Sequence, residues 1–288
     1  MVIGIHLIDS NKNEWGISMI ERKRVGDVEW VHGKVELAQS KLGVNVFVTD
    51  GLMIDTGSES MLSELIPFFQ SVDFDQVVLT HYHEDHTGGC AWIQKHKQVP
   101  LFIHSMSLDV CSKQGEYPDY RKRVWGVREG FQARPIGETI QSRHHIWRAI
   151  FTPGHARDHM SYLNESNGVL FSGDLFVMPK TKVILREESI PTIIHSIKKV
   201  LRYDFQEVFC CHAGYLSNGR ELFQVKLDYL ENLQGEIIRL HQQGLTVEEI
   251  QQKVLPKHYP IIEYSDYEWD SKHIITSILR EEQSVSIR

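Results

Sequence analysis

A short histidine-rich stretch carries the clearest chemical signal in this sequence of 288 residues. Residues 80–89 read Thr-His-Tyr-His-Glu-Asp-His-Thr-Gly-Gly and directly follow the apolar residues 77–79. The apolar run predicts a buried strand, and the two glycines predict a tight passage into a helix. Because imidazoles and carboxylates are side chains that bind divalent metals, the stretch predicts a metal site on a loop at the end of a strand.

The spacing within this stretch divides its polar side chains into two pairs. His81 and His83 are two residues apart, and such residues point to the same side of an extended backbone, so both imidazoles can reach one ion. Asp85 and His86 are adjacent and point away from the first pair unless the backbone turns. A turn there would direct them at a second ion beside the first. The alternative is a surface loop that is simply rich in histidine and acid.

The pattern His-x-His-x-Asp-His resembles the signature of the metallo-beta-lactamase superfamily. Three later motifs follow in the order typical of that family, and each ends in a candidate ligand: Thr152-Pro153-Gly154-His155, Phe171-Ser172-Gly173-Asp174 and Val208-Phe209-Cys210-Cys211-His212. An earlier segment, residues 52–57, resembles the first turn of the family. The resemblance extends over residues 45 to 214.

This resemblance implies an α/β fold, the four-layer αββα sandwich of the metallo-beta-lactamases, with a C-terminal helical extension. We therefore predict a metallo-beta-lactamase domain over residues 1–216 and a helical extension packed on it over residues 217–288. The arrangement is similar to the glyoxalase II-like branch, which also contains beta-lactamase-like single-strand endoribonucleases. Periodicity by itself predicts only a mixture of strands and helices.

A dinuclear metal centre is implied by the same resemblance. The ligands would be His81, His83 and His155 for one ion, Asp85, His86 and His212 for the other, and Asp174 as a bridge. A hydroxide between the ions would attack a thioester, an ester or lactone, or a phosphodiester, and Asp85 would also orient it as the catalytic residue. Two divalent ions are expected, with zinc as the first choice and manganese or iron as alternatives. The geometry of the ligands and the availability of each metal decide among them.

Two further polar residues are expected to support the ligands. Asp55, in the first turn, is assigned to hydrogen bonding of the ligand loop, since metal ligands need outer partners. His159 follows His155 by four residues, as a second histidine often does in glyoxalase II-like proteins, and is expected to make a structural hydrogen bond.

Other functions remain open at the level of the sequence. A mononuclear-iron persulfide dioxygenase uses a similar set of histidines, and a non-catalytic metal-binding module is the third option, although the complete set of seven ligands argues against it. His83 stands where flavodiiron proteins have glutamate, which argues against an oxygen-reducing diiron protein. Lactonases have a tyrosine three residues after the bridging aspartate, and Val177 in its place weakens that assignment.

Short strands, followed by alternating strands and helices, are predicted ahead of the extension. The predicted strands cover residues 2–8, 15–21, 28–35, 45–49, 52–55, 77–79, 99–104, 146–151, 160–163, 169–172 and 208–211. The predicted helices cover residues 58–70, 89–97 and 191–201.

Three capped helices are predicted in the extension. The first runs from Asn218 to Gly244, the second begins at Thr246, and the third begins at Ser265 and runs toward residue 282. The buried face of the first is predicted to carry Leu222, Val225, Tyr229, Leu233, Ile237 and Leu240. This extension is interpreted as a structural brace, with a lid or a homodimer contact as the alternatives.

Composition limits the partners. A net charge of −7, with 41% hydrophobic and 24% charged residues, is typical of a globular protein and argues against a constitutive nucleic-acid or membrane coat. No apolar stretch predicts a signal peptide or membrane span, and four cysteines without a CxxC pair favour a reducing compartment. We expect a cytoplasmic protein that acts on a small molecule or a single-stranded nucleic acid.

A basic and aromatic segment over residues 119–148 is the one candidate for substrate contact. It includes Arg121 and Arg123, and it could receive an anionic substrate. The alternative is a solvated insertion whose arginine stems pack on the sheet. Individual substrate-binding residues stay unknown at this stage.

Overall fold

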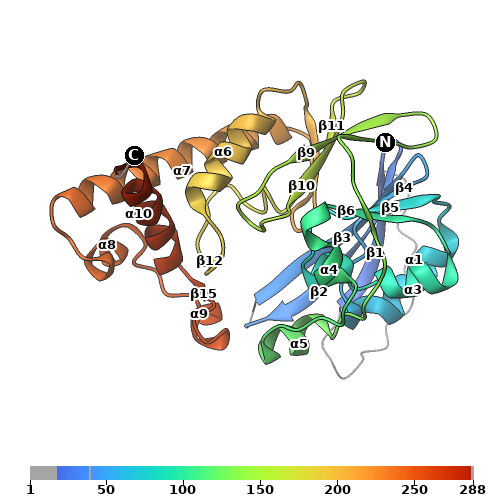
Figure 1. The fold of residues 1–288 in the computed structure, drawn as a ribbon, viewed down its shortest axis with the longest axis horizontal. Helices are drawn as coiled ribbons and strands as arrows, with labels where there is room; N and C mark the ends of the chain where they lie inside the picture. Colours follow the sequence, from blue (N-terminus) through green and yellow to red (C-terminus); the bar gives the residue numbers. More distant parts are fainter. Residues whose placement is uncertain (1–17, 39, 287–288) are drawn as a thin grey trace. The chain divides into compact units, whose positions relative to one another are not determined.

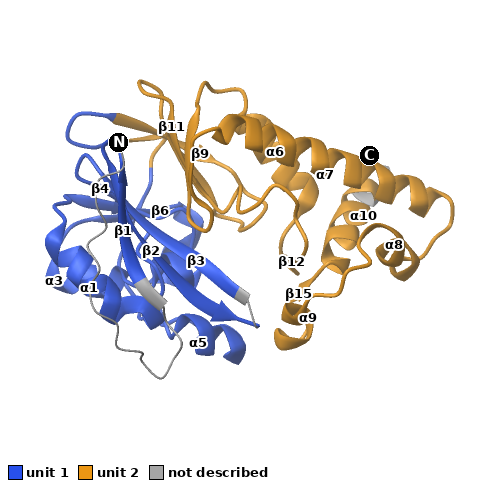
Figure 2. Cartoon of the chain, turned by 180° about the vertical axis from the view of Figure 1, so that it is seen from behind, with its two compact units in different colours: residues 1–136, 141–145 blue, residues 137–140, 146–288 orange. Residues whose placement is uncertain are grey.

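The computed structural model describes residues 18–38 and 40–286 (Figure 1). The strand predicted over residues 2–8 and the start of the one predicted over residues 15–21 lie outside this part. The chain forms two compact units (Figure 2). Unit 1 comprises the described residues up to Ile136 together with Gln141–His145, and unit 2 comprises Gly137–Ile140 and the described residues from Ile146 onward.

Unit 1 contains a mixed sheet with the strand order β1-β2-β3-β4-β5-β6-β7. Its strands are β1 Ser18–Val25, β2 Val28–Leu37, β3 Ser40–Thr49, β4 Leu52–Ile54, β5 Gln76–Val78, β6 Leu101–Ile103 and β7 Arg134–Pro135. The strands from β1 to β4 pair antiparallel, and those from β4 to β7 pair parallel. Because β4 and β5 are parallel neighbours, the segments that follow them leave the same edge of the sheet.

Short helices connect the parallel strands of unit 1. They are η1 Glu59–Met61, α1 Leu62–Ser71, α2 Glu84–Thr87, α3 Cys90–His96, η2 Ser105–Ser107, α4 Leu108–Cys111 and α5 Asp119–Trp125. Phe69 of α1, Val77 of β5 and Ile93 of α3 are fully buried in one apolar cluster. The helices therefore pack on the sheet through the apolar faces that their spacing predicted.

Unit 2 contains the second sheet, with the strand order β14-β13-β11-β10-β9-β8. Its strands are β8 Thr139–Gln141, β9 Ile146–Phe151, β10 Met160–Asn164, β11 Val169–Gly173, β13 Glu207–Cys210 and β14 Gly214–Leu216. Strands β11 and β13 pair parallel, whereas β10 pairs antiparallel with β9 and with β11, and β13 pairs antiparallel with β14. The crossover between them contains α6 Ile190–Val200 and β12 Ile184–Leu185.

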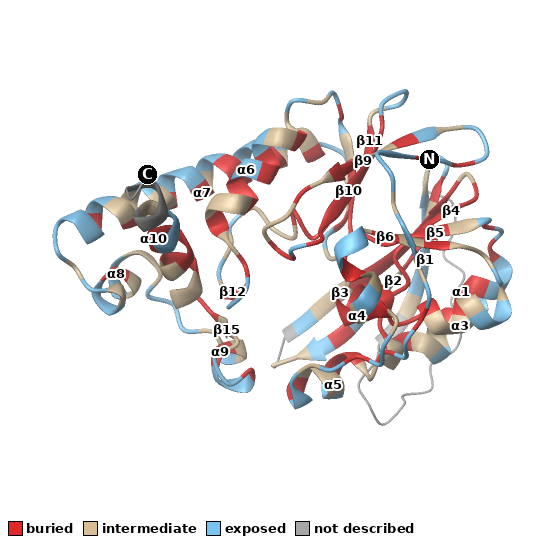
Figure 3. Cartoon of the chain, in the orientation of Figure 1, coloured by how far each residue is buried: buried red, intermediate tan, exposed pale blue. Residues whose placement is uncertain are grey.

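The C-terminal extension shares its apolar core with the second sheet. It contains α7 Gly219–Gln242, α8 Val247–Val254, α9 Pro260–Tyr264, β15 Trp269–Asp270 and α10 Lys272–Ser286. Leu230 of α7 and Ile275 of α10 belong to the same buried cluster as Leu170 of β11 and Ile197 of α6. Figure 3 shows these helices buried along one side only. This packing supports the interpretation of the extension as a brace.

Two details of the predicted extension are wrong. The third helix begins at Lys272, not at Ser265, because Asp266 and Tyr267 have positive φ angles of 50° and 60°, which a right-handed helix excludes. The Ser265 hydroxyl accepts the N–H of Trp269 and so closes a turn after α9. On α7, Val225 is 49% exposed, and the buried face begins with Phe223 instead.

The capping box predicted at Thr246 is present, since its side chain accepts the N–H of Glu249 while the Glu249 carboxylate accepts the N–H of Thr246.

No helix among residues 18–38 and 40–286 is both long enough and apolar enough to cross a membrane.

We expect truncation of the buried face of α7 to destabilise unit 2. Leu230→Ala should lower the free energy of unfolding by about 2–5 kcal/mol, because it leaves a cavity in the shared core. The matched change Val225→Ala, on the exposed face of the same helix, should alter it by less than about 0.5 kcal/mol. Urea denaturation monitored by tryptophan fluorescence measures both. Equal effects of the two changes would contradict a shared core.

Candidate metal centre

The loop after β5 gathers the candidate ligands of unit 1. His83 has extended backbone directly before α2, and its ring centroid lies 4.5 Å from that of His81. The chain then turns, because the carbonyl of His83 accepts the N–H groups of both His86 and Thr87 and starts α2. This turn brings the ring of His86 to 4.0 Å from that of His81, between centroids. The four residues predicted here as ligands are all buried.

Asp55 fixes this loop from the neighbouring strand end. Its carboxylate accepts the N–H of Thr80 at 2.7 Å and the hydroxyl of Thr80 at 2.8 Å. The same carboxylate lies 2.8 Å from Nδ1 of His86. With Nδ1 donating to Asp55, the lone pair of His86 is on Nε2, and Asp85 Oδ2 lies 3.6 Å from that atom. Asp55 is thus placed to set the tautomer of His86, as the sequence predicted for a supporting residue.

The first turn also holds the backbone of the ligand loop. Thr56 donates its N–H and its hydroxyl to the carbonyl of His86, at 2.8 and 2.9 Å. Gly88 donates its N–H to the carbonyl of Gly57 at 2.7 Å. A Cβ on Gly88 would meet backbone atoms of Ser58 and Glu59 within 2.6 Å, so the close approach of these segments requires glycine.

Unit 2 gathers the other three predicted ligands at the ends of β9, β11 and β13. Oδ2 of Asp174 lies 2.9 Å from Nε2 of His212 and 3.4 Å from Nε2 of His155. On the other side of the His155 ring, Nδ1 lies 3.1 Å from the buried carboxylate of Glu188. The two imidazoles therefore direct their Nε2 atoms toward a single carboxylate oxygen.

His159 lies behind Asp174. Its Nε2 accepts the backbone N–H of Asp174 at 2.9 Å, and its Nδ1 lies 2.9 Å from the hydroxyl of Thr152. Both ring nitrogens are therefore engaged in hydrogen bonds that orient the aspartate. These hydrogen bonds support the structural role expected for His159 from the resemblance to glyoxalase II-like proteins.

The donor sets of both units suit a divalent metal. Each contains buried imidazoles and at least one carboxylate, and in each a second carboxylate orders a histidine through Nδ1. Carboxylate–histidine pairs of this kind are typical partners of a bound metal. The metal ligands themselves stay a prediction, because each unit supplies only part of the proposed set.

Three residues that support the candidate metal centre were not predicted from the sequence. Glu188 lies 33 residues from His155 and carries no motif, so only the fold pairs the two. Thr80 directly precedes His81, and its adjacency to the motif was the available signal. Lys226 lies in the middle of α7 and reads as a surface lysine, yet it is only 5% exposed.

Lys226 stabilises a strained turn directly after Asp174. Val177 has a φ of 51°, which is a true outlier for a β-branched residue. The turn is closed by the N–H of Met178, which donates to the carbonyl of Phe176 at 2.6 Å, and the ammonium group of Lys226 donates to the same carbonyl. A buried cation thus anchors the backbone two residues after the proposed bridging ligand.

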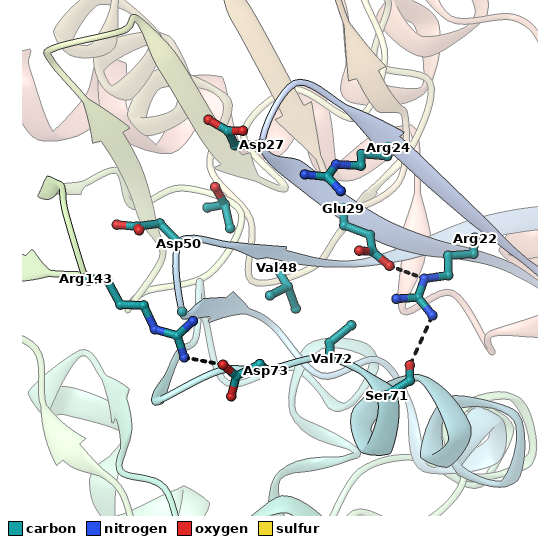
Figure 4. Close-up of a pocket in the computed structure, with 12 residues that line it drawn as sticks. Arg22, Arg24, Asp27, Glu29, Val48, Asp50, Ser71, Val72, Asp73 and Arg143 are labelled. Atoms are coloured by element: carbon teal, nitrogen blue, oxygen red, sulfur yellow. Dashed lines mark hydrogen bonds and ion pairs between the residues drawn. The ribbon is translucent and has the colours of Figure 1, made fainter. Parts of the chain in front are cut away.

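Two arginines of the basic segment are engaged by neighbouring groups of the protein. Arg128 donates to the carbonyls of Cys111 and Val110, and Arg143 pairs with Asp73 and Asp75. Arg143 lines a hollow of about 240 Å³ in unit 1, where Figure 4 shows it facing Asp73.

In the same hollow, Arg22 forms an ion pair with Glu29 (Figure 4). Arg22 and Arg143 are paired with carboxylates, and the guanidinium of Arg128 is occupied by carbonyl oxygens. The packing favours the alternative interpretation of a packed insertion.

The comparisons agree with this geometry. The family model described as the metallo-beta-lactamase superfamily matches residues 42–217. The chain belongs to the metallo-beta-lactamase superfamily. The family match confirms the resemblance found in the sequence and the predicted fold of the metallo-beta-lactamases. The helices of the predicted extension, from α7 to α10, follow the matched residues.

Two curated relatives illustrate the range of similarity. The chain is 32% identical over 175 residues to an atrochrysone carboxyl ACP thioesterase of Aspergillus fumigatus, covering 58% of this chain and 34% of the relative. It is 29% identical over 139 residues to a probable metallo-hydrolase of Bacillus subtilis, covering 46% and 62%. The chain therefore spans less than two thirds of the length of either relative.

Solved structures show the same fold at low identity. A beta-lactamase domain protein from Burkholderia ambifaria has a TM-score of 0.67 at 16% identity, over 91% of this chain and 88% of that chain. A metallo-beta-lactamase family protein from Thermus thermophilus has a TM-score of 0.61 at 18% identity, over 84% and 89%.

We expect the buried Lys226 to make stability depend on pH. Burial lowers its pKa from the ordinary 10.5 to about 8, so between these values the unfolded chain binds more protons and the free energy of unfolding rises with pH. The free energy of unfolding of the unmodified protein should rise, relative to that of Lys226→Met, by about 3 kcal/mol from pH 8 to 10.5. Urea denaturation across that range measures it, and a difference independent of pH would contradict the prediction.

Proposed function

We propose that the protein is a metal-dependent hydrolase with a dinuclear site. The proposed ligands are His81, His83, Asp85 and His86 of unit 1 and His155, Asp174 and His212 of unit 2. The observation that carries the proposal is the position of Asp174 Oδ2 between the Nε2 atoms of His155 and His212, since one carboxylate facing two imidazoles is suited to bridging. Two bound divalent ions would supply a water-derived nucleophile at neutral pH and stabilise negative charge on the substrate.

The residues of the chain have separate tasks in this proposal. Asp85 would orient the attacking water and accept its proton at a carboxylate oxygen. Asp55 and Glu188 keep the Nε2 lone pairs of His86 and His155 directed at the site, and His159 holds the backbone of Asp174. The near-complete burial of these groups limits access of bulk water.

A thioester is the substrate class that we favour within the set expected from the sequence. Thioesterases among the relatives support this choice, although the chain covers only part of them. A single-stranded nucleic acid is the weaker candidate, because phosphate binding relies on cationic side chains, while Arg143 is paired with aspartate and Arg128 is occupied by backbone carbonyls. Zinc is the proposed metal, since imidazole and carboxylate donors suit it.

Substitution of the proposed bridge should remove activity and leave the fold. We expect Asp174→Ala to lower thioester turnover below detection, while the circular dichroism spectrum stays that of the unmodified protein. Asp204→Ala is the matched control, because Asp204 is an exposed aspartate of the same unit, and it should keep full turnover. Normal turnover in Asp174→Ala would refute the bridging assignment.

Metal content discriminates the proposal from its alternatives. Elemental analysis of protein purified without added metal should give two ions per chain, zinc in excess, and a panel of thioester, lactone and phosphodiester substrates should show turnover of thioesters. One iron per chain with oxygen consumption on a persulfide would identify a dioxygenase instead. Metal binding without turnover of any substrate or oxygen consumption would favour a non-catalytic module.

A further inference from the structure

A buried ion pair holds the ligand loop of unit 1 at its centre. Glu84 stands between the proposed ligands His83 and Asp85, and its side chain is 3% exposed. Arg121 of α5 donates to both of its carboxylate oxygens, from Nε at 2.5 Å and from a terminal nitrogen at 2.7 Å. The Arg121 side chain is itself only 11% exposed. The pair therefore lies where water offers little alternative solvation to either charge.

The geometry of this pair is specific to arginine. Burial raises the pKa of Glu84, and the guanidinium group opposes that shift by favouring the ionised carboxylate. A planar guanidinium matches both carboxylate oxygens at once, whereas a lysine ammonium is a point charge on a flexible stem. Since a buried ion pair gains little net stability from its desolvated charges, its contribution is expected in position rather than in the free energy of folding.

Arg121 is in turn held in place by its surroundings. Its guanidinium lies 5.8 Å from the centroid of the Tyr117 ring. The Tyr117 hydroxyl donates to the carbonyl of Gly126 at 2.7 Å and accepts the N–H of Arg128 at 2.9 Å. These contacts tie the start of α5 to the segment after it, so the guanidinium approaches Glu84 from a fixed direction.

We propose that Arg121 is a positioning residue that sets the metal affinity of the loop. By holding Glu84, it fixes the first turn of α2, from which Asp85 and His86 project. The inference rests on the proposed function, because it assigns Arg121 to the ligand loop of that same site. It also replaces the hypothesis that Arg121 contacts an anionic substrate, since both carboxylate oxygens of Glu84 already engage its guanidinium.

Zinc affinity of the full-length, metal-free chain tests this role. Zinc is titrated in competition with a chromophoric chelator into the unmodified protein, Arg121→Met, Arg121→Lys and Arg123→Met. We expect Arg121→Met to weaken zinc binding by about 10-fold, the lower end of the cost of losing a direct partner of a ligand, because Arg121 acts on Asp85 and His86 through Glu84. Arg121→Lys should recover only part of the loss. Arg123→Met, an exposed residue of the same helix, should bind zinc like the unmodified protein.

A double variant controls for unfolding of Arg121→Met, which leaves the buried Glu84 without a counter-ion. Glu84→Gln/Arg121→Met removes both charges, so no buried charge is left uncompensated, and its metal-free melting temperature should stay near that of the unmodified protein. Its zinc affinity should still be weakened, because the bidentate contact is gone. A merely structural pair would lower the melting temperature of the variants without altering the zinc affinity of the folded chain.

The outcomes separate this inference from the function on which it rests. Unchanged zinc affinity in both Arg121→Met and the double variant, with normal binding by the unmodified protein, would overturn the inference alone. A raised KM for anionic substrates with unchanged zinc affinity would also overturn it and would restore the substrate-contact hypothesis. Failure of the unmodified protein to bind zinc would overturn the proposed function and the inference together.

Discussion

The pairing of buried carboxylates with buried imidazoles is the constraint on which the candidate centre depends. Asp55 pairs with Nδ1 of His86, and Glu188 pairs with Nδ1 of His155. Each pair selects the tautomer that leaves Nε2 as an acceptor, which is the state that a metal ligand requires. Because unpaired charges are costly away from water, the strand ends must deliver both members of each pair together. The sheets therefore position the candidate metal ligands and their partners, in addition to forming the apolar core.

Irregular backbone accompanies this arrangement in both units. Asp55 has a φ of 58° at the end of β4, and Val177 has a φ of 51° shortly after β11. Such conformations cost free energy and persist only where neighbouring contacts fix them. Thr80 and His86 provide those contacts for Asp55, and Lys226 provides them next to Val177. The helical extension thus contributes to the site by supplying a buried cation, in addition to closing the apolar core of unit 2.

The basic segment shows why composition is a weak guide to substrate contact. Its arginines suggested an anionic substrate, yet Arg121, Arg128 and Arg143 are engaged with a carboxylate, with carbonyls and with two aspartates, respectively. Local charge in a sequence does not reveal whether the opposite charge lies across the fold. Here the partner of Arg121 is 37 residues away, and the two partners of Arg143 are 68 and 70 residues away.

Much of this protein follows from the sequence by itself. The histidine motif, the alternation of strands and helices and the capping box of α8 are local patterns, and local patterns are set by backbone geometry and spacing. The later turns that end in His155, Asp174 and His212 were assigned through the resemblance to the metallo-beta-lactamase superfamily. Tertiary structure alone decided the partners of these groups, namely Glu188, Lys226 and the Glu84–Arg121 pair. It also decided that Asp266 and Tyr267 interrupt the expected third helix of the extension. The physical reason is that buried hydrogen bonds and ion pairs between distant segments depend on which segments the fold brings together. The periodicity of the sequence does not show which segments these are.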